Sequence, residues 1–417
     1  MTKIILRKGR EDSLRRFHPW VFSGAIAQIT GNPAEGDIVG VYSSEGVFLA
    51  AGHYQIGSIA VRVLSFDEDV LNPDYWEIML ARALQVRIAA GLAVEPGTGA
   101  DGSAAPVAAS PYGAGRCTNC YRLVHGEGDN LPGLIIDYYD GVCVLQAHSV
   151  GMFRARKQIS SALQKVYGET LCAVYDKSSG TAPFKAGLEL VDGYLYKREG
   201  FADDSKVVLE NGHKFIVDWN EGQKTGFFLD QRENRALVER YSKGRNVLNL
   251  FCYTGGFSIY ALAAGAVHVD SVDSSRKAMD MVDRNVALNG FAPEQHTSLC
   301  CDAIDYLKNV PEGKYDLMIV DPPAFAKHRG ALKNALRAYQ RLNAAAISKV
   351  APGGFVFTYS CSQVVDKEAF ALAVFSAAAQ CGRSVRILDR LNQPADHSVN
   401  IYHPEGEYLK GLLLYVE

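Results

Sequence analysis

The sequence predicts an α/β fold whose C-terminal half is a Rossmann-like, doubly wound parallel sheet. From Lys206 onward, short apolar runs rich in β-forming residues alternate with segments of helical periodicity. This alternation is typical of parallel sheets, which bind ligands beyond the carboxyl ends of their strands. Three distinctive stretches follow predicted strands: a glycine-rich turn at 251–257, Asp-Pro-Pro at 321–323 and Ser-Cys-Ser at 360–362. We therefore expect the functional site at that edge of the sheet.

The composition is typical of a globular protein with two or three domains. The chain has 417 residues, of which 48% are hydrophobic and 21% are charged. No apolar run approaches the ~18 residues of a membrane span, and the N-terminus lacks the pattern of a signal peptide. The nine cysteines are scattered, which predicts free thiols in a reducing compartment. We therefore expect a cytoplasmic protein without a membrane partner.

A metal site is not expected, although one cysteine pair has suitable spacing. Cys117 and Cys120 are three residues apart. A structural zinc ion needs four ligands, and neither a second cysteine pair nor a histidine pair follows at a usual distance.

A small β-barrel is predicted for residues 1–70. Short β-rich runs alternate with glycine turns up to about Phe66, a spacing typical of barrels with short strands. Residues 1–17 are locally basic, although the chain has a formal net charge of −3. They hold Lys3, Arg7, Lys8, Arg10, Arg15 and Arg16 against Glu11 and Asp12. A solvated surface and a nucleic-acid contact explain this charge equally well.

A central α+β domain is predicted for residues 71–200. It opens with helical periodicity at 73–91 and continues after Thr118 with strand and helix patterns. Between them, residues 91–116 are rich in small and turn-forming residues, which predicts a flexible insertion without fixed structure.

The third predicted domain, residues 201–417, carries the parallel sheet. It begins with a hairpin signal at Asn211-Gly212, and a short strand is expected just before Asp302. The other expected elements are helix 231–242, strand 246–251, helix 257–264, strand 268–273, helix 276–289, strand 317–320, helix 332–350, strand 354–359 and helix 367–379.

The glycine-rich turn predicts a cofactor site that differs from a dinucleotide or phosphate loop. It lacks the G-x-G-x-x-G spacing, and no Gly-Lys-Ser/Thr follows. Two adjacent glycines let the backbone approach a ligand without phosphates, such as S-adenosylmethionine. Asp273 ends the next strand and suits ribose hydroxyls, and Asp302 is placed to accept from an adenine amino group. Each aspartate alone also fits a helix cap. The residues assigned here to the cofactor are Asn249, Phe251, Tyr253, Thr254, Gly255, Asp273, Ser274, Asp302, Ala303 and Asp321.

These motifs resemble those of class I S-adenosylmethionine-dependent methyltransferases. A more specific stretch, residues 221–232, resembles the segment before the methyltransferase core in the bacterial 23S ribosomal RNA cytosine-5 methyltransferase family. In that family the segment closes over the cofactor. The resemblance therefore implies that five of its residues lie near the methionine end or the adenine: Lys224, Thr225, Phe228, Asp230 and Arg232.

Cys361 is the predicted nucleophile of a methyl transfer to carbon 5 of cytosine. That carbon becomes nucleophilic when a thiolate adds to C6, which requires a cysteine beside the cofactor and a group that polarises the ring. Cys361 follows a strand in a hydroxyl-rich turn, and Asp321 supplies the polarising group. The residues expected to contact the base are Pro322, Pro323 and Phe325, although Phe325 also fits a core position.

Other cysteines and acceptors remain possible at this point. Cys252 competes with Cys361, but its place in the glycine turn favours packing, and Cys300 and Cys301 fit strand core. Asp-Pro-Pro-Ala at 321–324 departs from the Asp-Pro-Pro-Tyr/Phe loops of amino-group methyltransferases, which favours carbon as the acceptor. The alternatives are uracil C5, a guanine nitrogen, or a non-catalytic RNA-binding or ribosome assembly factor. A catalytic role for His397 ranks below a structural one.

The resemblance extends to nearly the whole chain. Residues 1–66, with His18-Pro19-Trp20, resemble the PUA domain that opens members of this family. This implies that the basic residues Lys3, Arg7 and Lys8 contact 23S ribosomal RNA of the large subunit. The family also suggests a homodimer.

Overall fold

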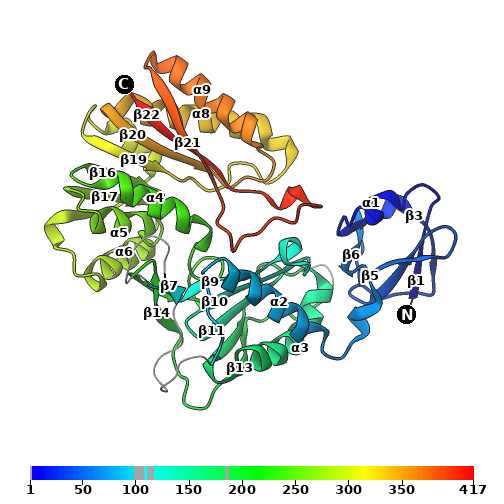
Figure 1. Cartoon of the computed structure of the whole chain (residues 1–417). Coiled ribbons are helices and arrows are strands. Elements are labelled where there is room, and N and C mark those ends of the chain that lie inside the picture. Colours follow the sequence, from blue (N-terminus) through cyan, green and yellow to red (C-terminus); the bar gives the residue numbers. More distant parts are fainter. Residues whose placement is uncertain (1, 98–107, 110–116, 184–186) are drawn as a thin grey trace. The chain divides into compact units, whose positions relative to one another are not determined.

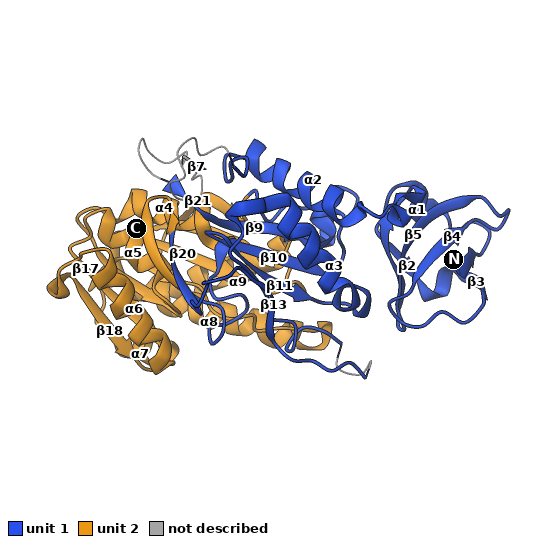
Figure 2. Cartoon of the chain, turned by 90° about the horizontal axis from the view of Figure 1, so that it is seen from below, with its two compact units in different colours: residues 1–208, 217–229, 395–406 blue, residues 209–216, 230–394, 407–417 orange. Residues whose placement is uncertain are grey.

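Residues 2–97, 108–109, 117–183 and 187–417 are described in this computed structural model (Figure 1). The chain divides into two compact units (Figure 2). One comprises residues 1–208, 217–229 and 395–406, and the other comprises 209–216, 230–394 and 407–417. The division into domains at 1–70, 71–200 and 201–417 stays a prediction. In the described part of the chain, no helix is long and apolar enough to cross a membrane.

The first unit opens with the predicted β-rich module. Its six strands, in the order β2-β6-β5-β4-β1-β3, are mostly antiparallel, and only β1 and β4 pair in parallel. Their bounds are β1 Thr2–Leu6, β2 Trp20–Phe22, β3 Ile26–Thr30, β4 Ile38–Tyr42, β5 Phe48–Tyr54 and β6 Ile59–Ser65, with the short helix α1 at Asp12–Arg15. Apolar side chains such as Ile4, Val39 and Val61 form its core.

The same unit contains a five-stranded sheet in the order β13-β12-β11-β10-β9. The strands are β9 Cys120–His125, β10 Leu134–Tyr139, β11 Val142–Ala147, β12 Ala173–Asp176 and β13 Gly193–Lys197, and the helices that share their core are α2 Tyr75–Ala89 and α3 Val150–Tyr167. The predicted elements of the central region are therefore confirmed, with boundaries that moved by a few residues.

The predicted flexible insertion at 91–116 is wrong at its start. Leu92 and Ala93 are buried in the core shared by α2 and the five-stranded sheet. A two-residue strand, β7 (Ala108–Ala109), pairs with β8 (Cys117–Thr118). Small residues lowered the sequence signal, but burial of apolar surface fixes these positions. Residues 98–107 and 110–116 of the predicted insertion lie outside the described residues.

The second unit carries the predicted Rossmann-like sheet. Its seven strands have the order β18-β17-β16-β19-β20-β22-β21. The first five run parallel, whereas β22 is antiparallel to both β20 and β21. The strands are β16 Asn246–Leu250, β17 His268–Asp273, β18 His296–Cys300, β19 Tyr315–Val320, β20 Val350–Ser360, β21 Val385–Asn392 and β22 Lys410–Val416. The antiparallel pair at one edge was not predicted.

Helices cover both faces of this sheet (Figure 1). They are α4 Arg232–Ser242, α5 Gly256–Ala263, α6 Arg276–Leu288, α7 Ala303–Asn309, α8 Leu332–Lys349 and α9 Lys367–Cys381. Helices α7, α8 and α9 share one apolar core with the strands. The predicted hairpin is also present, as β14 (Ser205–Glu210) and β15 (His213–Asp218). Asn211 and Gly212 both have positive φ, as a two-residue type I′ turn requires.

A buried histidine, His53, predicts that the free energy of unfolding falls in acid. His53, on β5, is 4% exposed and stacks on Trp76. A Cβ at Gly151 of α3 would lie 2.2 Å from its ring, so the imidazole has no room to move toward water. Burial lowers the pKa of His53 from 6.5 to about 4. The unfolded chain therefore binds this proton first, and stability is lost as pH falls from 6.5 towards 4.

We expect His53→Phe to reduce this acid sensitivity. Between pH 7 and 4.5, the wild type should lose about 2 kcal/mol more unfolding free energy than the variant, because Phe does not titrate. Urea unfolding at both pH values measures the difference, and His328→Gln at an exposed position is the control. An equal loss in wild type and His53→Phe would contradict the assignment.

Candidate active site

The predicted site residues of the second unit gather at one edge of its sheet. Leu250 pairs with both Val272 and Val320, and Val320 pairs with Thr358. Because these four strands are parallel, their carboxyl ends are level. The glycine turn, Asp273, Asp321 and Cys361 therefore all follow strands at the same edge, as predicted.

The glycine turn between β16 and α5 has an unusual backbone. Phe251 and Tyr253 have φ of 58° and 48°, and Gly255 has φ of 80°. Two non-glycine residues in the left-handed region cost of order 1–3 kcal/mol each, and such strain clusters at functional sites. A Cβ at Gly255 would lie 3.0 Å from Cγ1 of Val282 on α6, so only glycine fits without a shift.

Asp273 fastens this turn to the end of β17. Its Oδ2 accepts the Tyr253 backbone N–H at 3.1 Å, and its Oδ1 accepts that of Ser275 at 3.0 Å. A carboxylate oxygen can accept more than one hydrogen bond. The side chain is only half-buried, so both oxygens have acceptor capacity for the two hydroxyls of a ribose.

Asp302 caps helix α7. Its Oδ1 accepts the backbone N–H groups of Ile304 and Asp305, each at 2.9 Å. Among the described residues, no hydrogen bond reaches its Oδ2, and the side chain is exposed. The cap therefore leaves one acceptor for an adenine amino group. Asp273 and Asp302 thus fit the polar parts of S-adenosylmethionine, and Ser274 is exposed directly after β17.

Three residues predicted to contact the cofactor have no exposed side-chain surface. Thr225 donates to Asp137 Oδ2 at 2.6 Å and bonds the Tyr139 hydroxyl at 3.0 Å, which ties it to β10. Arg232 lies 3.6 Å from a buried carboxylate, Glu210. The Asn249 amide donates to Ser258 at 2.8 Å. Their side chains hold the fold together, so the structure does not support their direct contact with a cofactor.

The other three residues of segment 221–232 that were predicted to lie near the cofactor, Lys224, Phe228 and Asp230, lie in different units. Lys224 and Phe228 belong to the first unit, where the Lys224 ammonium lies 4.6 Å from the centre of the Phe228 ring. Asp230 belongs to the second unit and accepts the Tyr408 hydroxyl at 2.6 Å. Thr254, Gly255 and Ala303 are buried.

Asp321 is oriented by a residue that the sequence reasoning missed. Gln231, at the start of α4, donates from Nε2 to Asp321 Oδ2 at 2.9 Å. Asn234 in turn donates to Gln231 Oε1 at 2.6 Å, which fixes the amide orientation. Gln231 lies inside the quoted segment 221–232, but no spacing rule connects it to a position 90 residues later.

The Ser-Cys-Ser motif is anchored by both of its serines. Ser360 donates to the Tyr339 hydroxyl at 2.9 Å, and Ser362 donates to the Ala326 carbonyl at 2.6 Å. Both serines are buried, whereas Cys361 between them is half-exposed. The second bond ties the cysteine turn directly to the Asp-Pro-Pro loop.

Phe325 packs on the same tyrosine. The centres of the Phe325 and Tyr339 rings are 4.7 Å apart, which is the core position that the sequence left open. Burial raises the pKa of Tyr339 to about 12, and the charges of Cys361 and Asp321 add to this effect. The charges of both predicted catalytic groups therefore act on the Tyr339 hydroxyl. Pro322 is buried and Pro323 is exposed.

Cys361 is better suited to nucleophilic attack than its competitor. Cys252 is 7% exposed, and burial together with the Asp273 charge raises the pKa of its thiol well above the ordinary value. Such a thiol stays protonated and unreactive at neutral pH. The prediction that Cys301 is core is wrong, because its side chain is exposed just beyond β18.

His397 has a structural environment. It is 1% exposed, its Nδ1 lies 3.1 Å from Asp396 Oδ1, and its ring centre is 5.1 Å from that of His125. The backbone carbonyl of Asp396 accepts from Arg87, so His397 lies in a buried polar cluster of the first unit.

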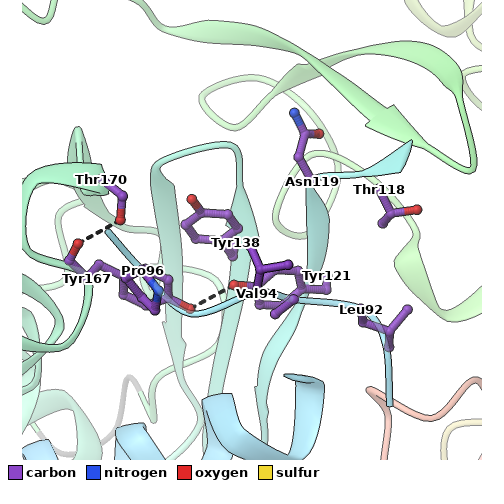
Figure 3. Close-up of a pocket in the computed structure, with 10 residues that line it drawn as sticks. Leu92, Val94, Pro96, Thr118, Asn119, Tyr121, Tyr138, Tyr167 and Thr170 are labelled. Atoms are coloured by element: carbon purple, nitrogen blue, oxygen red, sulfur yellow. Dashed lines mark hydrogen bonds between the residues drawn. The ribbon is translucent and has the colours of Figure 1, made fainter. Parts of the chain in front are cut away.

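A small cavity in the first unit is no substrate site. It is lined by a stack of three tyrosine rings, Tyr121, Tyr138 and Tyr167, and by residues that include Leu92, Val94 and Pro96 (Figure 3). Its volume of about 20 Å³ admits about one water molecule.

Comparisons with known proteins agree with this geometry. A model of S-adenosylmethionine-dependent methyltransferases matches residues 194–413, more than half of the chain, and a PUA-like model matches residues 4–66. Two proteins named Ribosomal RNA large subunit methyltransferase I, from Aeromonas hydrophila and Pseudoalteromonas translucida, are each 39% identical to the chain. The matches span 99% of this chain and 99% and 98% of those proteins.

The chain belongs to the ribosomal RNA large subunit methyltransferase I family. It is therefore an S-adenosylmethionine-dependent methyltransferase with an N-terminal PUA-like domain. Two solved structures share the fold at 23% identity over the whole of both chains. One is a methyltransferase complexed with SAH, with a TM-score of 0.80, and the other is a SAM-dependent methyltransferase from Streptococcus mutans, with a TM-score of 0.79.

The glycine turn offers a direct test of the cofactor site. In Gly255→Ala, the new Cβ would clash with Val282 and the alanine would be strained by its positive φ. In Gly265→Ala, the alanine would be strained only by its φ of +85°, because nothing lies within 4 Å of its Cβ. We expect Gly255→Ala to weaken S-adenosylhomocysteine binding by at least about tenfold, because a shifted turn misplaces Tyr253 and Asp273. Titration calorimetry measures both variants. Equal affinity for the two would argue against this turn as the cofactor site.

Proposed function

We propose that this enzyme methylates carbon 5 of a cytosine in large-subunit ribosomal RNA, with Cys361 as a covalent nucleophile. The supporting observation is the half-exposed Cys361 between two anchored serines, tied to the loop that carries Asp321. A partly exposed thiol in a fixed turn, tied to the loop that carries a polarising carboxylate, suits addition to a pyrimidine ring.

In the proposed reaction, the Cys361 thiol first loses its proton, and the thiolate adds to C6 of the cytosine. The electron pair of the C5=C6 bond moves onto C5, which becomes nucleophilic. S-adenosylmethionine, when bound, would supply an electrophilic methyl group to that carbon, and its methyl–sulfur bond would break to leave S-adenosylhomocysteine. A base then removes the C5 proton, and the C6–S bond breaks to restore the ring and release the thiolate.

Asp321 holds and polarises the base in this scheme. Its Oδ2 accepts from Gln231, which constrains one oxygen, and the half-buried group lies just beyond the end of β19. There it accepts from the exocyclic amino group of the cytosine, beside N3. Pro322, Pro323 and Phe325 stiffen and support this loop, and the base has to be unstacked from its RNA to reach it.

Ribosomal RNA is proposed as the partner on two grounds. The curated relatives carry large-subunit ribosomal RNA in their names, and the PUA-like module exposes Lys3, Arg7 and Lys8. The Arg7 Nε donates to the Ile26 carbonyl at 3.1 Å, which leaves its guanidinium partly available to phosphate. A ribosomal RNA substrate implies that the enzyme acts in the cytoplasm. A homodimer stays a prediction, which analytical ultracentrifugation checks.

We expect Cys361→Ala to abolish 5-methylcytosine formation on unmodified large-subunit RNA, whereas Cys381→Ala on α9 stays active. Labelled S-adenosylmethionine followed by nucleoside analysis measures this. RNA that contains 5-fluorocytidine should form a covalent adduct with the wild type, because fluorine at C5 cannot leave as a proton does. Label in a guanine or in uracil, or full activity without Cys361, would favour the other acceptors. Absence of S-adenosylmethionine binding would favour a non-catalytic RNA-binding factor.

We expect Gln231→Leu to lower the turnover number by roughly tenfold or more without a large change in cofactor affinity, because Asp321 loses its orienting hydrogen bond. Gln340→Leu, at a half-buried position on α8, is the matched control. Steady-state kinetics with both substrates separates the effects. A variant with normal turnover would show that Asp321 does not depend on Gln231.

A further inference from the structure

Lys410 is a buried charge that the proposed mechanism does not use. It opens β22, and its side chain is 5% exposed. It pairs with Ser360 on β20 and with Asn392 on β21, so it lies in the sheet directly beside the strand that leads to Cys361. Burial of an ammonium group is costly, and such groups are retained where they bind specific partners.

The partners of Lys410 belong to the cysteine turn. Its Nζ donates to the backbone carbonyl of Ser362 at 2.6 Å and to that of Val365 at 2.6 Å. These two carbonyls lie on the segment that immediately follows Cys361. The ammonium group therefore joins this segment to β22 at two points, and an ammonium group has three N–H donors in all.

Cys361 is also the strongest electrostatic neighbour of this lysine. Burial lowers the pKa of Lys410 to about 8, while a negative charge on Cys361 opposes that shift, ahead of Asp366 and Glu407. Lys367 is the only cation among these neighbours, and its ammonium is paired with Glu407. An attraction between two charges stabilises both of them. A thiolate at Cys361 therefore stabilises protonated Lys410, and protonated Lys410 stabilises the thiolate.

We propose that Lys410 is a positioning residue for Cys361, in which one ammonium group fastens the turn that carries the thiol and supplies the positive charge that favours the thiolate. The inference rests on the proposed function, in which Cys361 is the nucleophile. At neutral pH the ammonium form predominates, so the thiol proton is released to solvent while the charge of the sulfur is balanced by the lysine. As pH rises through 8, Lys410 loses its proton and this assistance is withdrawn.

The test is alkylation by iodoacetamide, followed residue by residue with mass spectrometry across pH 5–10. In this reaction the sulfur–carbon bond forms, iodide leaves and the thiol proton passes to the buffer. Exposed Cys301 serves as the internal reference. We expect Lys410→Met to lower the Cys361 rate at pH 7 by at least about tenfold relative to Cys301, because loss of one nearby charge shifts a thiol by about one pKa unit or more.

Charge and geometry are separated by two further variants. Lys410→Arg keeps the charge and should retain most of the Cys361 rate, and Lys349→Met, which removes a lysine at the end of α8, should leave it unchanged. Methyl transfer by Lys410→Met should recover as pH rises, because alkaline solution restores the thiolate. A purely structural lysine would give a lower melting temperature with no change in the alkylation profile and no alkaline recovery, which overturns the proposal.

If Lys410→Met does not fold, the proposal is tested on the wild-type protein alone. Cys361 should then reach its half-maximal alkylation rate at a lower pH than free glutathione does, since burial and the charges of Cys300 and Asp302 raise the pKa of Cys301 itself. An equal or higher pH overturns the proposal. The outcome is independent of the methylation assay. If Cys361→Ala remained active, the covalent mechanism would fail while the coupling of Lys410 to Cys361 could still be measured.

Discussion

A buried carboxylate, Glu210, holds together the parts of the second unit on which its site depends. Its side chain has no exposed surface, and Arg235 binds it with two hydrogen bonds of 2.7 Å. Burial by itself would lower the pKa of the Arg235 guanidinium. The charge and hydrogen bonds of Glu210 have the larger effect, so the pKa is raised. The Tyr260 hydroxyl donates to the same carboxylate at 3.0 Å. Glu210 thereby joins the hairpin to α4 and α5.

This joint fixes two functional segments at once. Helix α4 begins at Arg232, directly after Gln231, which orients Asp321. Helix α5 begins at the glycine turn, and a Cβ at Gly256 would lie 3.0 Å from the Arg235 side chain. Removal of one member of a buried ion pair leaves the other charge unpaired, which typically costs about 3–5 kcal/mol. The stability of the fold and the alignment of Asp321 with the glycine turn therefore depend on the same charges.

The cysteine turn is built by a different principle, with neutral hydrogen bonds and one ammonium group. Ser360 and Ser362 bind to Tyr339 and to the Asp-Pro-Pro loop, and Lys410 binds the turn from β22. A nucleophile has to be held near its target without being buried, because a desolvated thiol resists ionisation, as at Cys252. Anchoring the neighbours and leaving Cys361 half-exposed meets both requirements.

The parallel sheet, the edge where the site lies and the candidates Cys361, Asp321 and Asp273 could all be predicted from the sequence. Strand periodicity and the residues just after each strand are local properties, so they are readable along the chain. The burial of Thr225, Arg232 and Asn249 as hydrogen-bonding or ion-pairing groups depends on tertiary packing, as does the core position of Leu92 and Ala93. Gln231 and Lys410 are instructive for the same reason. Their partners lie 90 and 48 residues away, and contacts of that separation are set by how strands and helices pack, which no local pattern records.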